Sequence, residues 1–491
     1  LSLVGEDTKA CELAREPQLE RGVKATRARP ALSPFSHKTG YPARLRRFLL
    51  WRTVPRGTHE PLPSARPPIG SSPRLLPPNF FAPGHCVRCV RASGRWVQSM
   101  TPAARVKAAI DILDKVIEAA RGQGAPADRI VAEWAKANRY AGSKDRRAVR
   151  ELVYDAIRHC GPVPESGRAA MLALAKRDSA IAALFDGSQY GPAAIQPDEP
   201  VAKTGFAPAW LAKRLSASDV KGAEGAALMG RAPLDVRVNT LKGERDGIEL
   251  PVSGEPLAAP HALRFEAGTP VDQWDGFRDG RIEVQDHGSQ LACLAADAKP
   301  GETVIDLCAG AGGKTLALAA AMGNRGRLIA SDTDKRRLSQ LQPRIERAGV
   351  TIVEQRLLDP GKEMETLGDL AGAADCVLID APCSGTGTWR RKPEAKWRLT
   401  PDRLAKFAET QDMLLALGAK LVKPSGRLVF VTCSMLDEEG ADRFDAFLKS
   451  HQGWRADPPA LPLGRARGQG IRLSPFHDGT DGFFVARGHL P

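Results

Sequence analysis

The sequence after Gly280 alternates short apolar runs with longer segments of helical periodicity. The apolar runs lie in TVIDLC, RLIASD, TIVEQ, CVLIDAP and RLVFVTC, and helices are expected from Lys314, from Lys335, from Pro401 and over residues 437–450. Strands that alternate with helices in this way favour a parallel sheet covered by helices on both faces. The alternation therefore predicts an α/β fold for residues 281–491.

Two other textures precede this region. Between residues 103 and 190 apolar residues recur every three or four positions, as in RVKAAIDILDKVIEAA and KDRRAVRELVYDAIRHC. This periodicity predicts four or five helices in a small bundle, and we assign an all-α domain to residues 100–200. Residues 201–280 are mixed, since DVRVNTLKG predicts a strand and a turn and a stretch rich in Pro and Gly follows it. We expect them to form a connecting subdomain.

Residues 1–99 differ in composition from the rest of the chain. They hold 13 of the 38 prolines, and their 17 lysines and arginines against 6 acidic residues account for +11 of the formal net charge of +14. Such a segment cannot bury enough apolar surface to offset the entropy of ordering, so we expect a disordered leader. Helical periodicity begins directly after Met100, and we expect the working protein to start there, with translated upstream sequence before it. The basic charge therefore says little about nucleic acid binding by the rest of the chain.

The nine cysteines are mostly single residues, which is unlike a disulfide framework. Cys86 and Cys89 form a CxxC pair beside His85, but no second ligand pair follows at the spacing of a zinc finger, so we expect no metal. The chain shows no run of about 18 apolar residues that could span a membrane, and residues 1–30 lack the apolar core of a signal peptide. We therefore expect a cytoplasmic protein with reduced thiols and no membrane partner.

The segment VIDLCAGAGGKTLALAA predicts a strand, a glycine-rich turn and a helix, a layout that brings backbone amides close to a ligand. A P-loop would need glycine where Cys308 stands, and a dinucleotide loop would need glycine at Thr315. An S-adenosylmethionine loop needs neither. In that interpretation Asp306 ends the strand, the glycines wrap the methionine part, and Asp332 accepts hydrogen bonds from ribose hydroxyls. The glycines could instead serve only a tight turn.

Two cysteines follow two of the expected strands. Asp380 and Cys383 end CVLIDAPC, and Cys433 ends RLVFVTC, where we expect a helix to begin near Ser434. Ligands of open α/β sheets bind outside the carboxyl ends of strands, so Asp380 and the two thiols are expected to converge beside the glycine loop. One cysteine in a strand is usually a small apolar residue, whereas two beside an acid indicate chemistry. A helix N-terminus would lower the pKa of Cys433, although acidic residues 437–439 oppose this effect.

The motifs DLCAGAGGKT, SDTDKRRL, DAPCSGTGTWRRKPEAKW and FVTCSMLDEEG together resemble the RsmB/Nop/Sun family of RNA cytosine-5 methyltransferases. Weaker agreement extends the resemblance over roughly residues 230–490. Ala311 departs from the family pattern, which usually has proline there, but this removes no functional group. By texture and position, residues 100–200 resemble the NusB-like RNA-binding domain of bacterial RsmB-like members. The resemblance implies a Rossmann-like, class I S-adenosylmethionine-dependent methyltransferase domain preceded by an all-α NusB-like domain.

The chemistry of this family explains why two thiols are useful. Carbon 5 of cytosine is a poor nucleophile, so an enzyme that methylates it first adds a nucleophile at carbon 6. The resemblance implies that Cys433 is this nucleophile, that Cys383 helps to remove the carbon 5 proton, and that Asp380 hydrogen-bonds nitrogen 3 and steadies the developing charge. It implies S-adenosyl-L-methionine as the cofactor. The implied cofactor-binding residues are Cys308, Ala309, Gly310, Ala311, Gly312, Gly313, Lys314, Asp332, Asp380 and, by a looser alignment, Asp359.

The resemblance implies an RNA substrate, and rRNA is expected because the helical region resembles that of bacterial rRNA enzymes. The target cytosine must be unpaired or flipped out, because stacking shields carbon 6. Residues 388–398, TWRRKPEAKWR, place two tryptophans among five cations, which suits phosphate contact and base stacking, although a solvated loop fits the same pattern. In SPFHDGTDGFF, Asp481 and Gly482 predict a hairpin turn, and we expect His477 and Asp478 to be structural.

Three other classes of protein remain open. A non-catalytic RNA-binding or ribosome-assembly protein could retain the fold, but it would need neither Cys383 nor Cys433. A DNA cytosine-5 methyltransferase uses similar chemistry, but its nucleophile usually stands in a Pro-Cys motif, which here would be that of APCSGTG instead of the TCS after the last strand. A nicotinamide dehydrogenase is disfavoured by Thr315 in the glycine loop.

Overall fold

The structure, a computed structural model, describes residues 88–92, 95–122 and 124–491. Most of the predicted leader, with Cys86 and His85, lies outside these residues. Its described part, β1 (Arg88–Ala92) and β2 (Arg95–Ser99), forms an antiparallel pair. Within the described ranges, no helix is long and apolar enough to cross a membrane.

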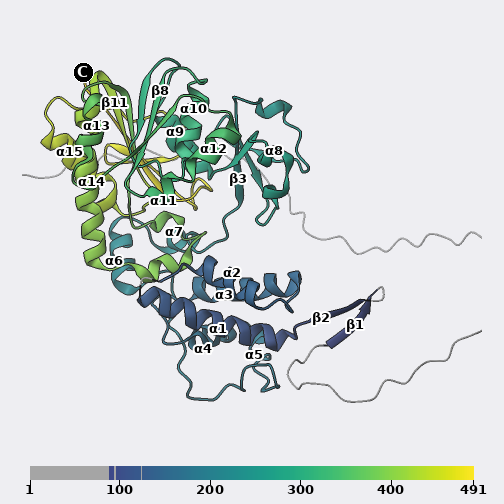
Figure 1. Cartoon of the computed structure of the whole chain (residues 1–491). Helices are drawn as coiled ribbons and strands as arrows, with labels where there is room; N and C mark the ends of the chain where they lie inside the picture. Colours follow the sequence, from purple (N-terminus) through teal and green to yellow (C-terminus); the bar gives the residue numbers. More distant parts are fainter. Residues whose placement is uncertain (1–87, 93–94, 123) are drawn as a thin grey trace, which may run out of the picture. The chain divides into compact units, whose positions relative to one another are not determined.

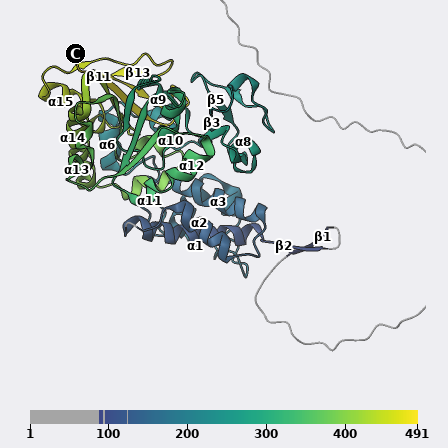
Figure 2. The same cartoon turned by 45° about the horizontal axis from the view of Figure 1, so that its top comes forward.

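Five helices form where the periodicity predicts them. They are α1 (Pro102–Arg121), α2 (Ala127–Ala137), α3 (Ser143–His159), α4 (Gly167–Arg177) and α5 (Ser179–Ala182). Thr101 caps α1 by accepting a hydrogen bond from the amide of Ala104 at 3.1 Å, and Ser166 caps α4 through the amide of Ala169 at 3.1 Å. Helices α1, α3 and α4 surround one apolar core, and Figure 2 shows α1, α2 and α3 side by side. The helical region is thus present, while its NusB-like character stays a prediction.

The connecting region contains a small antiparallel sheet of order β4-β5-β3-β6. Its elements are α6 (Ala209–Ala217), α7 (Gly222–Ala227), β3 (Leu234–Val238), η1 (Arg245–Gly247), β4 (Glu255–Pro256), β5 (Ala262–Phe265), η2 (Val271–Gln273), α8 (Asp275–Arg278) and β6 (Ile282–Val284). Val236, Phe265 and Trp274 are buried together, with the Phe265 and Trp274 rings edge to face at 5.2 Å. This sheet therefore has a core of its own.

The large sheet has the order β13-β14-β15-β11-β10-β7-β8-β9. Its strands are β7 (Thr303–Asp306), β8 (Arg327–Asp332), β9 (Val353–Leu357), β10 (Ala374–Asp380), β11 (Val422–Thr432), β12 (Arg455–Ala456), β13 (Arg465–Arg467), β14 (Gly470–Leu473) and β15 (Phe483–His489). The strands from β7 to β11 are parallel, as predicted, whereas β12 to β15 are antiparallel to their neighbours. The sheet is therefore mixed. The expected hairpin pairs β14 with β15, but residues 474–482 connect them instead of a tight turn at Asp481 and Gly482.

Helices cover both faces of this sheet, as Figure 1 shows for α9, α10 and α12 on one face and α13, α14 and α15 on the other. Alternate strand residues enter two apolar cores, so that Leu378 packs with the first set of helices and Val377 with the second. The helices are α9 (His287–Ala295), α10 (Gly313–Ala321), α11 (Lys335–Leu338), α12 (Leu341–Ala348), α13 (Glu363–Leu367), α14 (Pro401–Leu421) and α15 (Ala441–Ser450), with the 3-10 turns η3 (Gly368–Leu370), η4 (Thr386–Thr388), η5 (Pro393–Arg398) and η6 (Asp437–Glu439).

Candidate active site

Polar side chains lie at the carboxyl ends of four parallel strands, along one edge of the large sheet. Asp306 ends β7, Asp332 ends β8 and Asp380 ends β10, while Cys433 follows β11. Strands β7 and β10 are neighbours although β8 and β9 lie between them in the sequence, so the strand order reverses at this point. Open α/β sheets bind ligands at such a reversal, and the edge is therefore the candidate active site.

The glycine-rich turn after β7 needs glycine at two positions. Gly310 has φ 56° and its amide donates to Oδ2 of Asp332 at 2.8 Å. Gly312 has φ 85° and precedes α10, and a Cβ there would lie 2.0 Å from Cδ1 of Leu341. Both positive φ angles favour glycine. The glycine turn and Asp332 are thus in direct contact, as expected if both belong to one binding site.

Asp306 has one satisfied and one unsatisfied carboxylate oxygen. Its Oδ2 accepts a hydrogen bond from Oγ1 of Thr315 at 2.6 Å, whereas its buried Oδ1 has no partner among the described residues. Burial raises the pKa of Asp306 to about 7, against the smaller opposite effect of Thr315. A buried oxygen without a donor is costly, so this position suits a ligand that brings a hydrogen-bond donor.

Lys314, on the first turn of α10, forms a buried ion pair with Asp380. Its Nζ lies 2.7 Å from Oδ2 of Asp380, and only 9% of its side chain is exposed. Burial acts to lower the pKa of Lys314, but the Asp380 carboxylate outweighs it, and the pKa lies above its ordinary value. The ammonium group also lies 5.6 Å from the centroid of the Phe483 ring. The pair joins the glycine turn to the end of β10.

The loops after β10 and β11 place two thiols side by side. Sγ of Cys383 lies 3.4 Å from Sγ of Cys433, within hydrogen-bonding reach. The hydrogen bond to Cys433, followed by burial, raises the pKa of Cys383 well above its ordinary value. Cys383 is therefore placed to exchange a proton with a group bound beside the second thiol.

The buried carboxylate of Glu439 connects the two cysteine loops. From the sequence we expected it only to oppose a lowered pKa of Cys433. Glu439 is fully buried and accepts hydrogen bonds from the amide of Ser384 at 2.7 Å, from the Ser384 hydroxyl, and from Oγ of Ser434 at 2.6 Å. Thr386 completes this set, because its Oγ1 lies 3.1 Å from Oγ of Ser434. We call Ser384, Thr386, Ser434 and Glu439 the Glu439 network. The signal for it was the serine directly after each cysteine.

The predicted helix from Ser434 is wrong. Residues 433–436 are irregular, η6 follows, and α15 begins only at Ala441. The amides that would open a helix are bound by side chains, since Met435 N donates to Oγ1 of Thr386 at 2.8 Å and Leu436 N to Oγ of Ser434 at 3.1 Å. A helix N-terminus therefore does not act on Cys433.

The predicted base stacking by the two tryptophans of residues 388–398 is also wrong. Trp389 is fully buried and Trp397 is 5% exposed. Trp397 packs into the core of the helical region, and its Nε1 donates to the carbonyl of Gly161 at 3.2 Å. Glu394 accepts from the amide of Ala127 at 3.2 Å. This segment follows β10 of the large sheet, and Gly161 and Ala127 belong to the helical region. It therefore connects the two regions.

The remaining candidates differ in burial. Asp359 follows β9, but its side chain is 70% exposed, and its contact to Lys362 is 3.9 Å long. Cys308 packs against the core around α14, and burial raises its pKa well above the ordinary value. Asp478 accepts hydrogen bonds from the amides of Gly464 at 3.0 Å and Ser474 at 2.8 Å, and His477 lies 3.8 Å from Glu224. The described contacts of Asp478 and His477 are thus structural, as expected.

Comparisons with known proteins match this part of the chain. Residues 293–488 match the family model described as 16S rRNA methyltransferase RsmB/F. A Synechocystis protein named "Probable ribosomal RNA small subunit methyltransferase B" is 34% identical over 268 residues, which are 52% of this chain and 59% of that protein. The Xylella fastidiosa ribosomal RNA small subunit methyltransferase B is 32% identical over 291 residues, which are 57% of this chain and 68% of that protein.

The solved structures agree. The crystal structure of PH0851 is 26% identical, with a TM-score of 0.61, and the match covers 79% of this chain and 99% of that one. The α/β fold predicted from the strand and helix alternation is confirmed, and so is the methyltransferase domain that the family resemblance implies. The chain spans between about 59% and 68% of the length of the two curated relatives above. This chain belongs to the 16S rRNA methyltransferase RsmB/F family.

Proposed function

We propose that the protein is an S-adenosylmethionine-dependent RNA methyltransferase that forms 5-methylcytosine in rRNA. The observation that carries the proposal is the pair of thiols of Cys383 and Cys433, 3.4 Å apart, at the edge where Asp306, Asp332 and Asp380 end their strands. A binding protein would need neither thiol. The family of the chain and the names of its relatives support rRNA as the substrate and disfavour the DNA methyltransferase and dehydrogenase alternatives.

The residues around the glycine turn fit S-adenosyl-L-methionine, which supplies an electrophilic methyl group when bound. The unsatisfied Oδ1 of Asp306 can accept a hydrogen bond from an ammonium group, and Asp332 can accept from ribose hydroxyls. Residues 308–314 form the turn between these two acids, where only glycine permits the close approach at positions 310 and 312. Asp359 follows the neighbouring strand β9 and stays a candidate on the adenine side.

Three side chains act on the cytosine ring in this mechanism, those of Cys433, Asp380 and Cys383. The thiolate of Cys433 adds to carbon 6, which makes carbon 5 nucleophilic enough to take the methyl group. As the thiolate adds, nitrogen 3 takes up a proton supplied by the ion pair of Lys314 and Asp380, 2.7 Å apart, and the Asp380 carboxylate then accepts a hydrogen bond from the N–H that results. Cys383 then assists removal of the carbon 5 proton, and the carbon–sulfur bond breaks to release Cys433. Because ribosomal RNA is the substrate, we propose that the protein acts in the cytoplasm.

The test is methyl transfer from radiolabelled S-adenosylmethionine to total rRNA by wild type, Cys433→Ala and Cys383→Ala. We expect Cys433→Ala to lose transfer. We expect Cys383→Ala to accumulate a protein band linked to RNA on denaturing gels, because the covalent adduct forms but is not resolved. Absence of transfer by the wild type to every RNA offered, with cofactor binding intact, would favour the RNA-binding alternative.

A further inference from the structure

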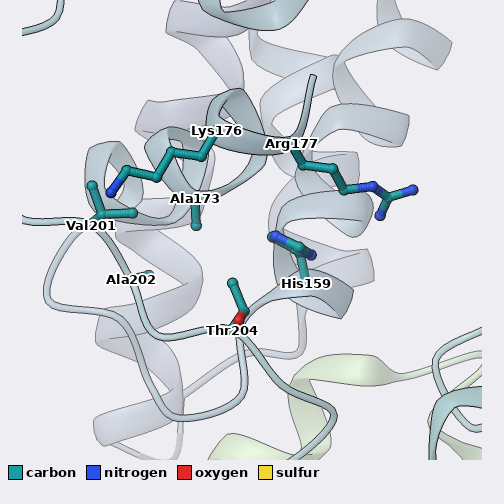
Figure 3. Close-up of a pocket in the computed structure, with 7 residues that line it drawn as sticks. All are labelled: His159, Ala173, Lys176, Arg177, Val201, Ala202 and Thr204. Carbon is teal, nitrogen blue, oxygen red and sulfur yellow. The ribbon is translucent and has the colours of Figure 1, made fainter. Parts of the chain in front are cut away.

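Three hollows along α3 share their walls. The first is lined by Arg147, Arg150 and Tyr154 of α3 together with Arg231, Arg390 and Arg391. The second shares Arg158 and Arg231 with the first and ends at His159 and Arg177. The third shares His159, Arg177 and Thr204 with the second, and Figure 3 shows Lys176 and Arg177 extending in opposite directions from the end of α4 above the His159 ring. The three hollows adjoin through these shared residues, and we call them together the α3 groove.

The α3 groove carries more positive than negative charge. Its acidic residues are Glu151, Asp155 and Asp178. Arg231 lies 3.5 Å from Glu151 and Arg158 lies 3.2 Å from Asp155, while Asp178 accepts a hydrogen bond from the amide of Ala180 at 2.9 Å. In contrast, Arg147, Arg150, Lys176 and Arg177 have no carboxylate within 4.0 Å among the residues that the structure describes. Arg150 instead lies 5.7 Å from the centroid of the Tyr154 ring. Four cations spread along the groove are therefore available to an external anion.

One wall of the groove is tied to the cysteine site. Arg390 and Arg391 contact opposite oxygens of Asp481, at 2.9 and 2.6 Å. The next residue, Gly482, donates its amide to the carbonyl of Gly387 at 2.8 Å, and Gly387 donates its amide to the carbonyl of Cys433 at 3.0 Å. Two backbone hydrogen bonds thus separate the groove wall from the loop of Cys433. An anionic polymer in the groove would thus contact arginines that are joined through Asp481 and these bonds to the loop of Cys433.

We propose that the α3 groove binds the phosphodiester backbone of a single-stranded RNA segment beside the target nucleotide. The inference rests on the proposed function for its choice of RNA. Separate cations along a groove match the repeating phosphates of a polymer, and arginine suits phosphate because its planar group donates two parallel hydrogen bonds. A single strand also meets the need for an unpaired target base.

The test uses two charge reversals at exposed positions, Arg147→Glu with Arg150→Glu on α3, and Lys176→Glu with Arg177→Glu on α4. The matched control is Arg325→Glu, an exposed arginine between α10 and β8 at the opposite edge of the large sheet. The probe is a short fluorescein-labelled single-stranded RNA, whose binding is followed by anisotropy at several salt concentrations. We expect each double variant to lose affinity about tenfold or more, and the slope of log affinity against log salt to flatten by about 0.7 for each lost phosphate contact.

The outcomes separate this proposal from the proposed function. Wild-type affinity and slope in both double variants would overturn the groove, even with normal methyl transfer. If the wild type transfers no methyl group but binds RNA more tightly than the double variants do, the groove is supported and the proposed activity is not. Equal competition by a polyglutamate peptide would overturn RNA in favour of an acidic protein partner. The variant Arg150→Lys keeps the charge but loses the planar group, so it should keep the wild-type salt slope and lose part of the affinity.

Discussion

The sulfur of Cys383 lies 3.4 Å from the sulfur of Cys433, although the two residues follow different strands. A disulfide needs a sulfur–sulfur distance of about 2.05 Å, so the two atoms need to approach by little more than an ångström to become bonded. The residue after each cysteine, Ser384 or Ser434, donates a hydrogen bond to Glu439, so the Glu439 network links the two loops. The arrangement on which the proposed two-thiol catalysis depends thus also brings the thiols close to forming a disulfide that would block it.

We predict that mild oxidation with diamide joins Cys383 to Cys433. The two thiols would lose two protons and two electrons to the diamide, and methyl transfer would stop until dithiothreitol restores it. Thiol titration should show that oxidation removes two more thiols from the wild type than from Cys433→Ala, a difference that cancels any oxidation of the Cys86 and Cys89 pair in both proteins. The buried Cys376, with its pKa raised by burial to about 12, should not react in the folded protein. An equal loss of thiols from the wild type and from Cys433→Ala would contradict the pairing.

The glycine turn predicts a sharp contrast between adjacent positions. Gly312→Ala places a Cβ 2.0 Å from Leu341 at φ 85°, whereas Gly313→Ala meets no heavy atom within 4 Å. We expect the first change to lower the free energy of unfolding by about 1–3 kcal/mol and to weaken S-adenosylmethionine binding, because the strain moves the turn. The second should leave both nearly unchanged. Urea unfolding and calorimetric titration of the cofactor measure the two effects, and equal effects of both changes would contradict the assignment.

The Glu439 network predicts a loss of catalysis without a loss of cofactor binding. In Glu439→Gln the amide nitrogen cannot accept hydrogen bonds, so at least one of the three donors from Ser384 and Ser434 stays unpaired. This should cost about 1–3 kcal/mol of stability and slow single-turnover methyl transfer about 100-fold as the thiols shift.

The matched control for this change is Glu438→Gln, whose side chain is 35% exposed and pairs with Arg214 at 2.7 Å. It should remain near wild type in rate and in the affinity for S-adenosylmethionine. A wild-type rate in Glu439→Gln would show that the network does not position the thiols.

Local patterns predicted the strands and the site edge well, because apolar runs and strand-end acids are short-range signals. They could not predict what depends on partners far along the chain. From the sequence, Trp397 was expected to stack on a base. In the structure it instead packs in the core of the helical region and donates a hydrogen bond to Gly161. The expected helix from Ser434 fails because Thr386, 49 residues away, binds the Met435 amide. The antiparallel strands β12 and β13, of two and three residues, are too short to show alternation.

The last prediction concerns the pH dependence of stability. The pKa of Asp306 is raised by burial to about 7, while an unfolded aspartate has a pKa of about 3.9. The folded chain therefore holds this proton more tightly, and its contribution to stability is present below pH 4 and lost as the pH rises towards 7. Each pKa unit corresponds to about 1.4 kcal/mol, so the loss has an upper bound of about 4 kcal/mol.

Asp306→Asn removes this titration and keeps an oxygen that accepts from Thr315. Without cofactor, we expect the free energy of unfolding of the variant to fall less steeply than that of wild type between pH 4 and 7, and the variant to be the more stable of the two at pH 8. Urea unfolding at several pH values measures the difference. Asp359→Asn, with a side chain 70% exposed, controls for the loss of one carboxylate. Parallel curves for wild type and Asp306→Asn would contradict the raised pKa of Asp306 in the folded protein.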